Sequence, residues 1–419
     1  MPRAFQVPTF YRSPYISLVK KYRQAVDPRK RDLSPTILDF GPVRFKIGRH
    51  FGFCFGVENA IEIAYRAITE NTTKRIFLLS EMIHNPEVNR DLQERGVRFL
   101  MNTDGSVRIP FSELTPDDIV IVPAFGTTLE LQAQLATTGI DPYYYDTTCP
   151  FVKKVWKRSA ELGTAQFSVI IHGRRAHEET RATFSHSARE SPTIIVRDMA
   201  DTEYLIQFLK GEVRLEQFAE HFAGAMSEGF DPLIHLKRVG VVNQTTMLAS
   251  ETQAIARRIR ETMAELYGAR HLAEHFADTR DTLCYATNEN QTATQSLLAA
   301  GADLAIVVGG YNSSNTSHLV ELAERVMPTY YIRDYTEIID HRSIRHFVLE
   351  KQTTEVTSPW FPENRRGAPV DIALISGASC PDSTVDQVLQ RILGFFTDAR
   401  DCEEVFRPFA ELPNSSPAL

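Results

Sequence analysis

Short apolar runs followed by small polar loops and amphipathic helices recur along most of the chain. The runs predict strands at residues 43–47, 75–79, 118–122, 143–145, 167–171, 238–242, 304–308 and 372–375. Helical periodicity follows most of these strands, at 58–68, 87–94, 151–162, 248–266, 289–299, 317–326 and 383–395. This alternation predicts an α/β fold with parallel sheets, in which ligands bind beyond the carboxyl ends of the strands.

A cysteine stands at the first of these strand ends. Cys54 lies between Phe53 and Phe55, and Gly52 and Gly56 bracket the three residues. The glycines permit backbone geometry or a close approach that a side chain would block. The thiol would stand at the amino end of a helix, where a thiolate is favoured. For a lone cysteine, however, a buried apolar role is the more usual explanation.

Two further cysteines, Cys149 and Cys284, occupy turns of the same kind. Five cysteines in 419 residues are too few for a disulfide framework and favour a reducing compartment. The cysteines form no local CxxC pair, so their spacing alone only weakly favours one shared metal centre. Cys380 competes for such a role, whereas Cys402 lies near the tail and is discounted.

Polar loops with anion-binding character follow other strands. Residues 312–315 (Asn-Ser-Ser-Asn) and 376–379 (Ser-Gly-Ala-Ser) present hydroxyls, amides and backbone N–H groups at predicted helix starts. Ordinary N-capping would explain either loop about as well. His177 and Glu179 share the loop after strand 167–171, where they could bind a phosphate and deliver a proton. Together with Thr245, these loops favour a phosphate or diphosphate ligand, although no P-loop is present.

Composition narrows the class of protein. A hydrophobic content of 43% and a charged content of 24% are typical of soluble globular proteins. The net charge of −7 argues against a nucleic-acid binder, and apolar runs such as 305–308 are too short to span a membrane. The first 26 residues hold five basic residues and no acid, which suits a transit peptide. They are poor in serine, so we interpret them as the arm of a cytoplasmic protein.

At these positions the chain resembles a known enzyme family, the LytB-type 4-hydroxy-3-methylbut-2-enyl diphosphate reductases of the non-mevalonate isoprenoid pathway. The matching motifs occur in the order of the family, at residues 52–57, 83–86, 146–150, 177–180, 243–246, 284–287, 312–315 and 376–379. The long N-terminal arm, the residues 123–126 and an insertion at about 201–236 are similar to the cyanobacterial and plant branch.

The resemblance implies three small α/β domains with parallel sheets, arranged as a trefoil around a central iron–sulfur cavity. We therefore divide the chain into an arm, three domains and a tail, at 1–42, 43–146, 147–281, 282–396 and 397–419. From residue 413 onward we expect disorder.

The resemblance also implies roles for individual residues. Cys54, Cys149 and Cys284 match the three ligands of a [4Fe–4S] cluster whose fourth iron takes the hydroxyl oxygen of the substrate. The residues implied to hold the diphosphate are His84, His177, Ser313, Ser314, Asn315 and Ser379. Glu179 and Thr245 match the proton-delivery pair, and Thr287 is a lesser member of the same network.

One position departs from many bacterial members, which have a histidine where this chain has Phe125. A phenyl ring cannot donate a hydrogen bond to a diphosphate. We expect the backbone N–H groups of Gly126 and Thr127 to replace that contact, and Phe125 to form an apolar wall. His172 and Arg174 are the alternative replacements.

The implied reaction is the two-electron reductive dehydroxylation of (E)-4-hydroxy-3-methylbut-2-enyl diphosphate to isopentenyl and dimethylallyl diphosphates. Ferredoxin or flavodoxin is the electron donor that the resemblance implies. Two alternatives remain open from the residues: a non-catalytic diphosphate-binding or iron–sulfur sensor protein, and a metal-free α/β transferase with incidental cysteines. Glu179 favours the enzyme, because binding alone needs no acid beside the anion.

Overall fold

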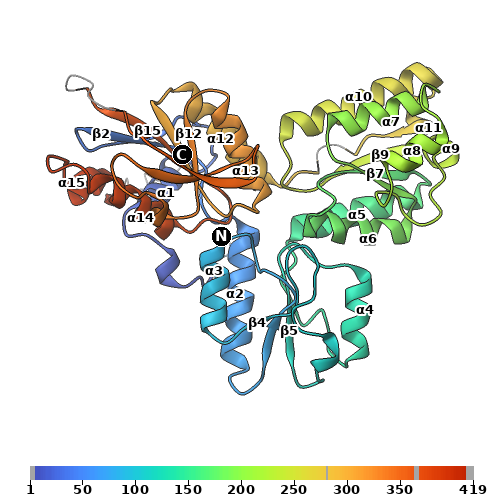
Figure 1. The fold of residues 1–419 in the computed structure, drawn as a ribbon, viewed down its shortest axis with the longest axis horizontal. Coiled ribbons are helices and arrows are strands. Elements are labelled where there is room, and N and C mark those ends of the chain that lie inside the picture. The colour runs from blue at the N-terminus through green and yellow to red at the C-terminus, as the bar shows by residue number, and fades with distance from the viewer. Residues whose placement is uncertain (1–4, 280–281, 363–367, 412–419) are drawn as a thin grey trace, which may run out of the picture. The chain divides into compact units, whose positions relative to one another are not determined.

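The computed structural model describes residues 5–279, 282–362 and 368–411 (Figure 1). Its contacts divide the chain into two compact units. The first unit holds Met1–Phe55, His84–Pro86 and Tyr285–Leu419, and the second holds Gly56–Ile83 and Glu87–Cys284.

The first unit is built on a seven-stranded mixed sheet. In spatial order its strands are β1 (Thr36–Asp39), β2 (Val43–Ile47), β15 (Val370–Ser376), β11 (Leu304–Val308), β12 (Thr329–Ile332), β13 (Ile344–Val348) and β14 (Thr353–Thr357). The four strands from β2 to β12 are parallel, while β1, β13 and β14 add antiparallel edges. The central strand β11 is buried at every position, as expected of a parallel strand covered on both faces.

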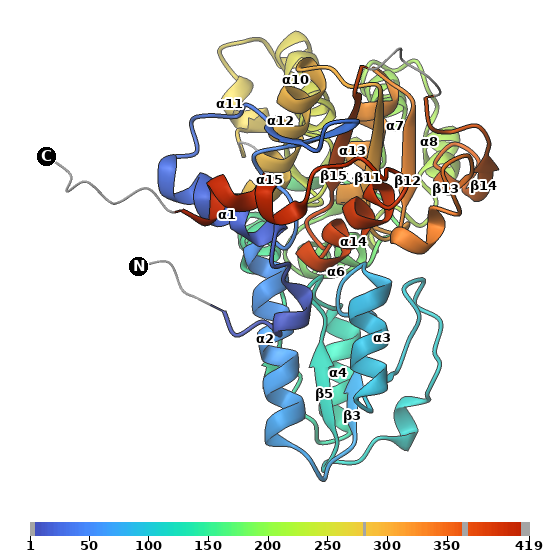
Figure 2. The same cartoon turned by 90° about the vertical axis from the view of Figure 1, so that its left-hand side faces the viewer.

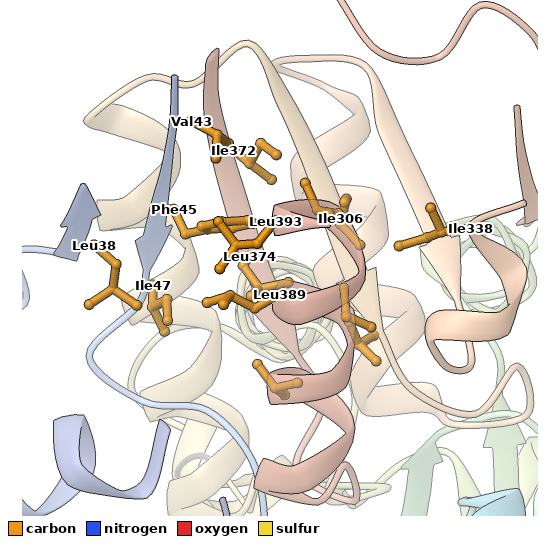
Figure 3. Packing of buried hydrophobic residues seen from close by; sticks show 14 of the residues in the cluster. Leu38, Val43, Phe45, Ile47, Ile306, Ile338, Ile372, Leu374, Leu389 and Leu393 are labelled. Carbon is orange, nitrogen blue, oxygen red and sulfur yellow. The ribbon is translucent and has the colours of Figure 1, made fainter. Parts of the chain in front are cut away.

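Helices cover both faces of this sheet. The helices of the unit are α1 (Ile16–Val26), α12 (Tyr285–Ala299), α13 (Ser314–Glu324), α14 (Asp382–Leu393) and α15 (Cys402–Ala410). Side chains of α1, α14 and α15 share one hydrophobic core with alternate residues of β2, β15 and β11. Figure 3 shows Leu389 and Leu393 of α14 over Phe45 and Leu374 of the sheet. The contacts of α12 and α13 with β11, β12 and β15 place these two helices on the opposite face.

Near both ends of the chain, the observed units differ from the predicted domain boundaries. Val43–Ile47 does not open a separate first domain, because it pairs with Val370–Ser376 of the seven-stranded sheet. The expected arm supplies α1 and β1 to the same unit, and helix Cys402–Ala410 lies in the expected tail and packs against α1. Periodicity predicted the strand but carries no information on its partner. The disorder predicted from residue 413 falls outside the described residues.

Two four-stranded sheets, both fully parallel, form the second unit. The strands of the first are β4 (Arg98–Phe99), β3 (Ile76–Leu78), β5 (Ile119–Val122) and β6 (Tyr145–Asp146). Its helices are α2 (Phe55–Glu70), α3 (Pro86–Glu94) and α4 (Leu129–Thr137), which flank the sheet in Figure 2.

The other sheet of this unit has helices on both faces (Figure 1). Its strands are β10 (Phe276–Ala277), β9 (Val239–Asn243), β7 (Ser168–His172) and β8 (Thr193–Val196). One face carries α5 (Pro150–Thr164) and α6 (Glu178–Glu190), and the other carries α7 (Met199–Leu209) and α10 (Ala249–Tyr267). The short helices are α8 (Leu215–His221), α9 (Pro232–His235) and α11 (Leu272–His275).

The predicted α/β class with parallel sheets is confirmed, and the trefoil arrangement stays a prediction. The helical pattern of the 201–236 insertion is also confirmed. Phe218 and Phe222 of this segment are buried in the core beneath β7 and β9, so the insertion is an integral layer of its sheet. Within the described ranges, no helix is long and apolar enough to cross a membrane.

Candidate active site

Most of the predicted diphosphate-binding residues gather in the first unit, where β11 and β15 end. The Ser379 hydroxyl donates to the carbonyl of His84 (3.2 Å), and the Asn315 side-chain oxygen accepts from the Ala378 N–H (2.9 Å). His84 also lies against Gly310, where an added Cβ would collide with the His84 carbonyl. The structure therefore brings two predicted loops and the histidine segment into one polar cluster.

Every predicted member of this cluster is buried. The members are His84, Ser313, Ser314, Asn315 and Ser379. Ser313 is the N-cap of α13, and its hydroxyl accepts from the Thr316 N–H (3.3 Å). Capping thus occupies this hydroxyl as an acceptor, while its proton is able to donate to a ligand. The Asn315 Nδ2 atom is buried and has no hydrogen-bond partner among the described residues. Such an orphaned donor fits an anion bound at the start of α13.

Cys54 stands in the same unit, immediately before the first residue of α2. Its N–H donates to the carbonyl of Ala378 (3.1 Å), in the loop that also carries Ser379. Gly52 has a positive φ of 70°, and its N–H donates to the Ser376 hydroxyl (3.1 Å). An added Cβ at Gly52 would collide with Lys20 and Asp382, so the expected need for glycine here is confirmed.

Cys149 and Cys284 lie in the second unit. Cys149 is the N-cap of α5, and its N–H donates to the carbonyl of Ala124 (2.9 Å). Cys284 directly precedes α12, and its N–H donates to the carbonyl of Thr245 (3.1 Å). All three predicted cysteines are therefore partly exposed thiols at helix starts, and none forms a disulfide.

Burial opposes ionisation of the Cys149 thiol. Desolvation is the largest effect and raises the pKa of Cys149 to about 11, although the Phe151 N–H hydrogen-bonds the sulfur and lowers the pKa. Smaller electrostatic contributions from Cys284 and Glu179 raise the pKa further, because like charges disfavour one another. These contributions show that both residues lie near Cys149.

Glu179 and Thr245 are joined by two hydrogen bonds. The Thr245 N–H donates to Glu179 Oε1 (2.5 Å), and the Thr245 hydroxyl donates to Oε2 (2.9 Å). Both residues are buried. Glu179 lies in the first turn of α6 rather than in the expected loop, so a helix sets its position. The pair is therefore a hydrogen-bonded unit with little access to water.

His177 caps the same helix. Its Nδ1 accepts from the Glu179 N–H (3.2 Å), which places the ring proton on Nε2. The ring of Phe125 meets the His177 ring edge to face at 5.6 Å. The predicted phosphate ligand His177 and the departure at Phe125 are thus direct neighbours.

Two of the expected replacement contacts at Phe125 need correction, those of the Gly126 N–H and His172, while those of the Thr127 N–H and Arg174 stay predictions. The Gly126 N–H donates to the carbonyl of Pro123 (2.9 Å), and α4 begins three residues later at Leu129. Gly126 has a positive φ of 78°, and an added Cβ there would also collide with the ring of Trp156. His172, a second expected replacement, is fully buried with its Nδ1 at 3.2 Å from the Thr252 hydroxyl. A local turn thus uses the Gly126 N–H, and packing against α10 buries His172.

The other two cysteines have structural surroundings. Cys380 is buried in the core of the first unit, and Cys402 opens α15, where its sulfur accepts from Gln390 (3.2 Å). Among the residues that the structure describes, no three His, Cys, Asp or Glu side chains form a metal-holding group. The fit of an iron–sulfur cluster therefore rests on donor chemistry, namely three thiols outside any disulfide that each stand at a helix start.

Asn290 is a candidate ligand-binding residue that was not identified from the sequence. Asn290 lies one turn beyond Thr287 on α12, and both side chains are buried. The Nδ2 atom of Asn290 has no hydrogen-bond partner within the described ranges. The three-residue spacing, which places the two residues on one helix face, was the available signal. We add Asn290 to the candidate ligands in the first unit.

Comparison with known proteins gives a consistent assignment. The family model described as LytB protein matches residues 46–393. The 4-hydroxy-3-methylbut-2-enyl diphosphate reductase of Thermosynechococcus vestitus is 40% identical over 353 residues, which are 84% of this chain and 85% of that protein. The enzyme of the same name from a Synechococcus strain is 39% identical over 90% of this chain and 92% of its own length.

A solved structure shares the fold. It is the E-1-hydroxy-2-methyl-but-2-enyl-4-diphosphate reductase from Plasmodium falciparum, with a TM-score of 0.58 and 20% sequence identity. The match covers 82% of this chain and 86% of that one.

Proposed function

Because the chain belongs to the LytB protein family, we propose that it is a 4-hydroxy-3-methylbut-2-enyl diphosphate reductase. It converts (E)-4-hydroxy-3-methylbut-2-enyl diphosphate to isopentenyl and dimethylallyl diphosphates, the last step of the non-mevalonate pathway. Two electrons and two protons enter, the carbon–hydroxyl bond breaks and the oxygen leaves as water. A new C–H bond forms at either end of the allylic unit, which accounts for two products.

Cys54, Cys149 and Cys284 are the residues that would hold a [4Fe–4S] cluster. When bound, such a cluster supplies electrons and an open iron position that polarises a hydroxyl oxygen. Binding requires thiolates, and the raised pKa of Cys149 means that this thiol must lose its proton as the cluster is taken up. The burial of Cys380 in the hydrophobic core supports leaving it out of the ligand set.

The polar cluster of the first unit would bind the diphosphate. His84, Ser313, Ser314, Asn315 and Ser379 are buried together, and the unpartnered Nδ2 of Asn315 supports an anionic ligand at this place. His177 of the second unit and Thr287 complete the proposed ligand set. A helix start supplies backbone donors as well as side chains, so the anion needs no lysine or P-loop.

The single observation that most supports the proposed reaction is the hydrogen-bonded pair of Glu179 and Thr245. Glu179 is the proposed acid. Thr245 donates its hydroxyl to this carboxylate, and its carbonyl accepts from the Cys284 N–H. Protonation of the departing hydroxyl turns a poor leaving group into water, which is a typical task of a positioned carboxylic acid. The sensor alternative lacks support, because the relatives are named as reductases.

Ferredoxin or flavodoxin is the electron donor that we propose, and the cytoplasm is the proposed compartment. A reducing compartment is supported by the five cysteines, none of which forms a disulfide in the structure described.

The decisive test is anaerobic reconstitution of the full chain, followed by iron and sulfide counting and by turnover with the allylic diphosphate. We expect about four irons per chain and both product diphosphates under reducing conditions. A reconstituted protein that binds the diphosphate but forms neither product would restore the sensor alternative.

A further inference from the structure

A cleft of about 660 Å³ lies along α6 in the second unit. Its described lining residues include none of the proposed catalytic or diphosphate-binding residues. One wall is the helix face of Arg181, Phe184, Ser185, Ala188 and Arg189. The other walls are the start of α4, the segment 224–228 and the side chain of Arg175. The volume falls within the usual range of small-molecule sites.

The insertion supplies the wall at 224–228. The Ile195 N–H donates to the carbonyl of Ala225 (2.8 Å), and the Ser227 N–H donates to the carbonyl of Thr193 (2.9 Å). These bonds hold the segment beside β8. Gly224 has a positive φ of 68°, and an added Cβ there would collide with the guanidinium of Arg175. The wall is thus built around this arginine.

The opposite wall is tied to α6 by hydrogen bonds. The Leu129 N–H donates to the Ser185 hydroxyl (2.9 Å), which in turn donates to Glu130 (2.9 Å). The same helix is therefore bonded to the start of α4, while the insertion is bonded to β8. Since backbone bonds hold one wall and side-chain bonds hold the other, the cleft is a formed site in this structure.

Two arginines of the cleft are held by neutral groups. Arg175 donates to the carbonyl of Ala223 (2.7 Å), and Arg181 donates to the carbonyls of Ala176 (3.0 Å) and Thr103 (2.7 Å). Neither guanidinium forms an ion pair within the described ranges. Backbone carbonyls fix the orientation of the two cations without neutralising their charge.

The remaining charges of the cleft are accounted for. Arg189 pairs with Glu190 (2.7 Å), and Glu130 accepts from Ser185. Glu228 lies at the exposed rim. Outside the lining, hydrogen bonds from Ser106 lower the pKa of Asp104, and Arg181 makes a smaller electrostatic contribution.

Apolar side chains form the rest of the lining. They are Leu129, Phe184, Ala188, Ile195 and Met226. Ile195 is buried, whereas Phe184 and Met226 are partly exposed. Hydrocarbon surface beside two unneutralised guanidinium groups suits a ligand that has an anionic head and an apolar body.

We propose that this cleft binds a small amphiphilic anion, a phosphate or diphosphate group on a short hydrocarbon chain. Arg175 and Arg181 contact the head, and the five apolar side chains contact the hydrocarbon. Arg175 precedes His177 by two residues and Arg181 follows Glu179 by two, so the ligand braces the segment that carries both. The site does not depend on the reductase activity.

The test uses metal-free full-length protein with Phe184→Trp as a local fluorescent reporter. The probes are dimethylallyl diphosphate, inorganic diphosphate as the head alone and 3-methylbut-2-en-1-ol as the tail alone. We expect saturable binding of dimethylallyl diphosphate that weakens at least tenfold in the Arg175→Gln, Arg181→Gln double variant. The matched control is Arg260→Gln, an exposed arginine on α10, which should leave the dissociation constant unchanged.

The outcomes separate the proposal from its competitors. Equal dissociation constants in the double variant and the control would overturn the site. Inorganic diphosphate binding as tightly as dimethylallyl diphosphate would overturn the amphiphilic ligand. If the double variant fails to fold, Met226→Glu leaves both arginines in place, and its acidic side chain should abolish binding by repelling the anion. Because cluster-free protein is used, failure of the reductase activity leaves these readouts interpretable.

Discussion

The Glu179 carboxylate shows how a single buried residue is prepared for chemistry. Two hydrogen bonds from Thr245 satisfy its two oxygens, and α6 fixes its backbone. We predict that Glu179→Gln retains the cluster and binds substrate but loses about 10²–10⁴-fold in turnover, because an amide cannot donate an acid proton. The measurement is anaerobic single-turnover kinetics with iron content determined on the same sample.

Thr245→Ser is the matched control for this prediction, since it keeps the hydroxyl that donates to Glu179. It should retain far more activity than Glu179→Gln. A Glu179→Gln protein with near wild-type turnover would move the acid to another residue, with Thr245 and Thr287 examined next.

The cysteines give a second prediction at this scale. Serine at position 54, 149 or 284 should abolish cluster assembly, because a hydroxyl does not supply the thiolate that iron–sulfur clusters need. Cys402→Ser should leave the iron and sulfide content unchanged, as Cys402 lies on α15 beside Gln390. Iron counting and the visible absorption of reconstituted proteins provide the readout. Full occupancy in Cys149→Ser protein would remove this residue from the ligand set.

At the scale of elements, the turn before α2 depends on packing from α1 and α14. Gly52 has a positive φ and lies against Lys20 and Asp382, which form an ion pair with each other. Gly41 also has a positive φ, of 95°, but an added Cβ there would meet nothing within 4 Å. Substitutions at the two glycines therefore distinguish the cost of backbone strain alone, at Gly41, from the cost of strain plus a steric collision, at Gly52.

We predict that Gly41→Ala lowers the free energy of unfolding by about 1 kcal/mol, the usual cost of a positive φ for alanine. Gly52→Ala should cost more, because Lys20 and Asp382 must also move. Urea unfolding of both variants gives the comparison. Equal losses would show that the ion pair yields without cost, and that only backbone conformation requires Gly52.

At the scale of the whole molecule, stability should depend on the protonation of one partly buried acid. Burial raises the pKa of Asp386 on α14 from an ordinary value of 3.8 to about 6, although hydrogen bonds to Gln390 and Ser13 offset part of this effect. The folded protein therefore binds a proton more tightly than the unfolded chain. Stability falls as pH rises through about 4 to 6 and stays at the lower level above that range.

We predict that Asp386→Asn raises the free energy of unfolding by on the order of 1 kcal/mol at pH 7–8 and changes it little below pH 4. Each unit contains one tryptophan, so Trp360 in a Trp156→Phe background reports unfolding of the first unit alone. The free energies of unfolding with Asp386 and with Asp386→Asn are compared in this background. A difference between them that stays constant from pH 4 to pH 8 would contradict the proposed titration.

The local pattern of apolar and polar residues was sufficient to predict most of the helices and strands near the site. Strand Leu304–Val308 was predicted with its observed bounds, and most other predicted elements end within a few residues of their predictions. Periodicities of two and of 3.6 residues are local properties, so they can be read without knowing any partner. Pattern was insufficient for strands at or next to a sheet edge, such as Thr193–Val196 and Ile344–Val348, which depend on pairing with neighbours.

The same division holds for the candidate site. Motifs in the sequence identified the three cysteines, Glu179 and the polar loops, because each stands where a strand gives way to a helix. Only the tertiary structure showed that Thr245 bonds Glu179 and that Ser379 bonds the carbonyl of His84. These contacts join residues far apart in the chain, and no local pattern encodes which distant partner a group will find.

By itself, then, the sequence determined the α/β class, the order of the elements and the chemistry available at the strand ends. The tertiary structure decided that Val43–Ile47 pairs with Val370–Ser376 and that the Gly126 N–H is already bonded. It also decided that the insertion forms one wall of the cleft along α6. Strand pairing and cleft formation are set by burial and backbone hydrogen bonding between distant segments. Their free energy depends on the whole folded chain rather than on any stretch of it.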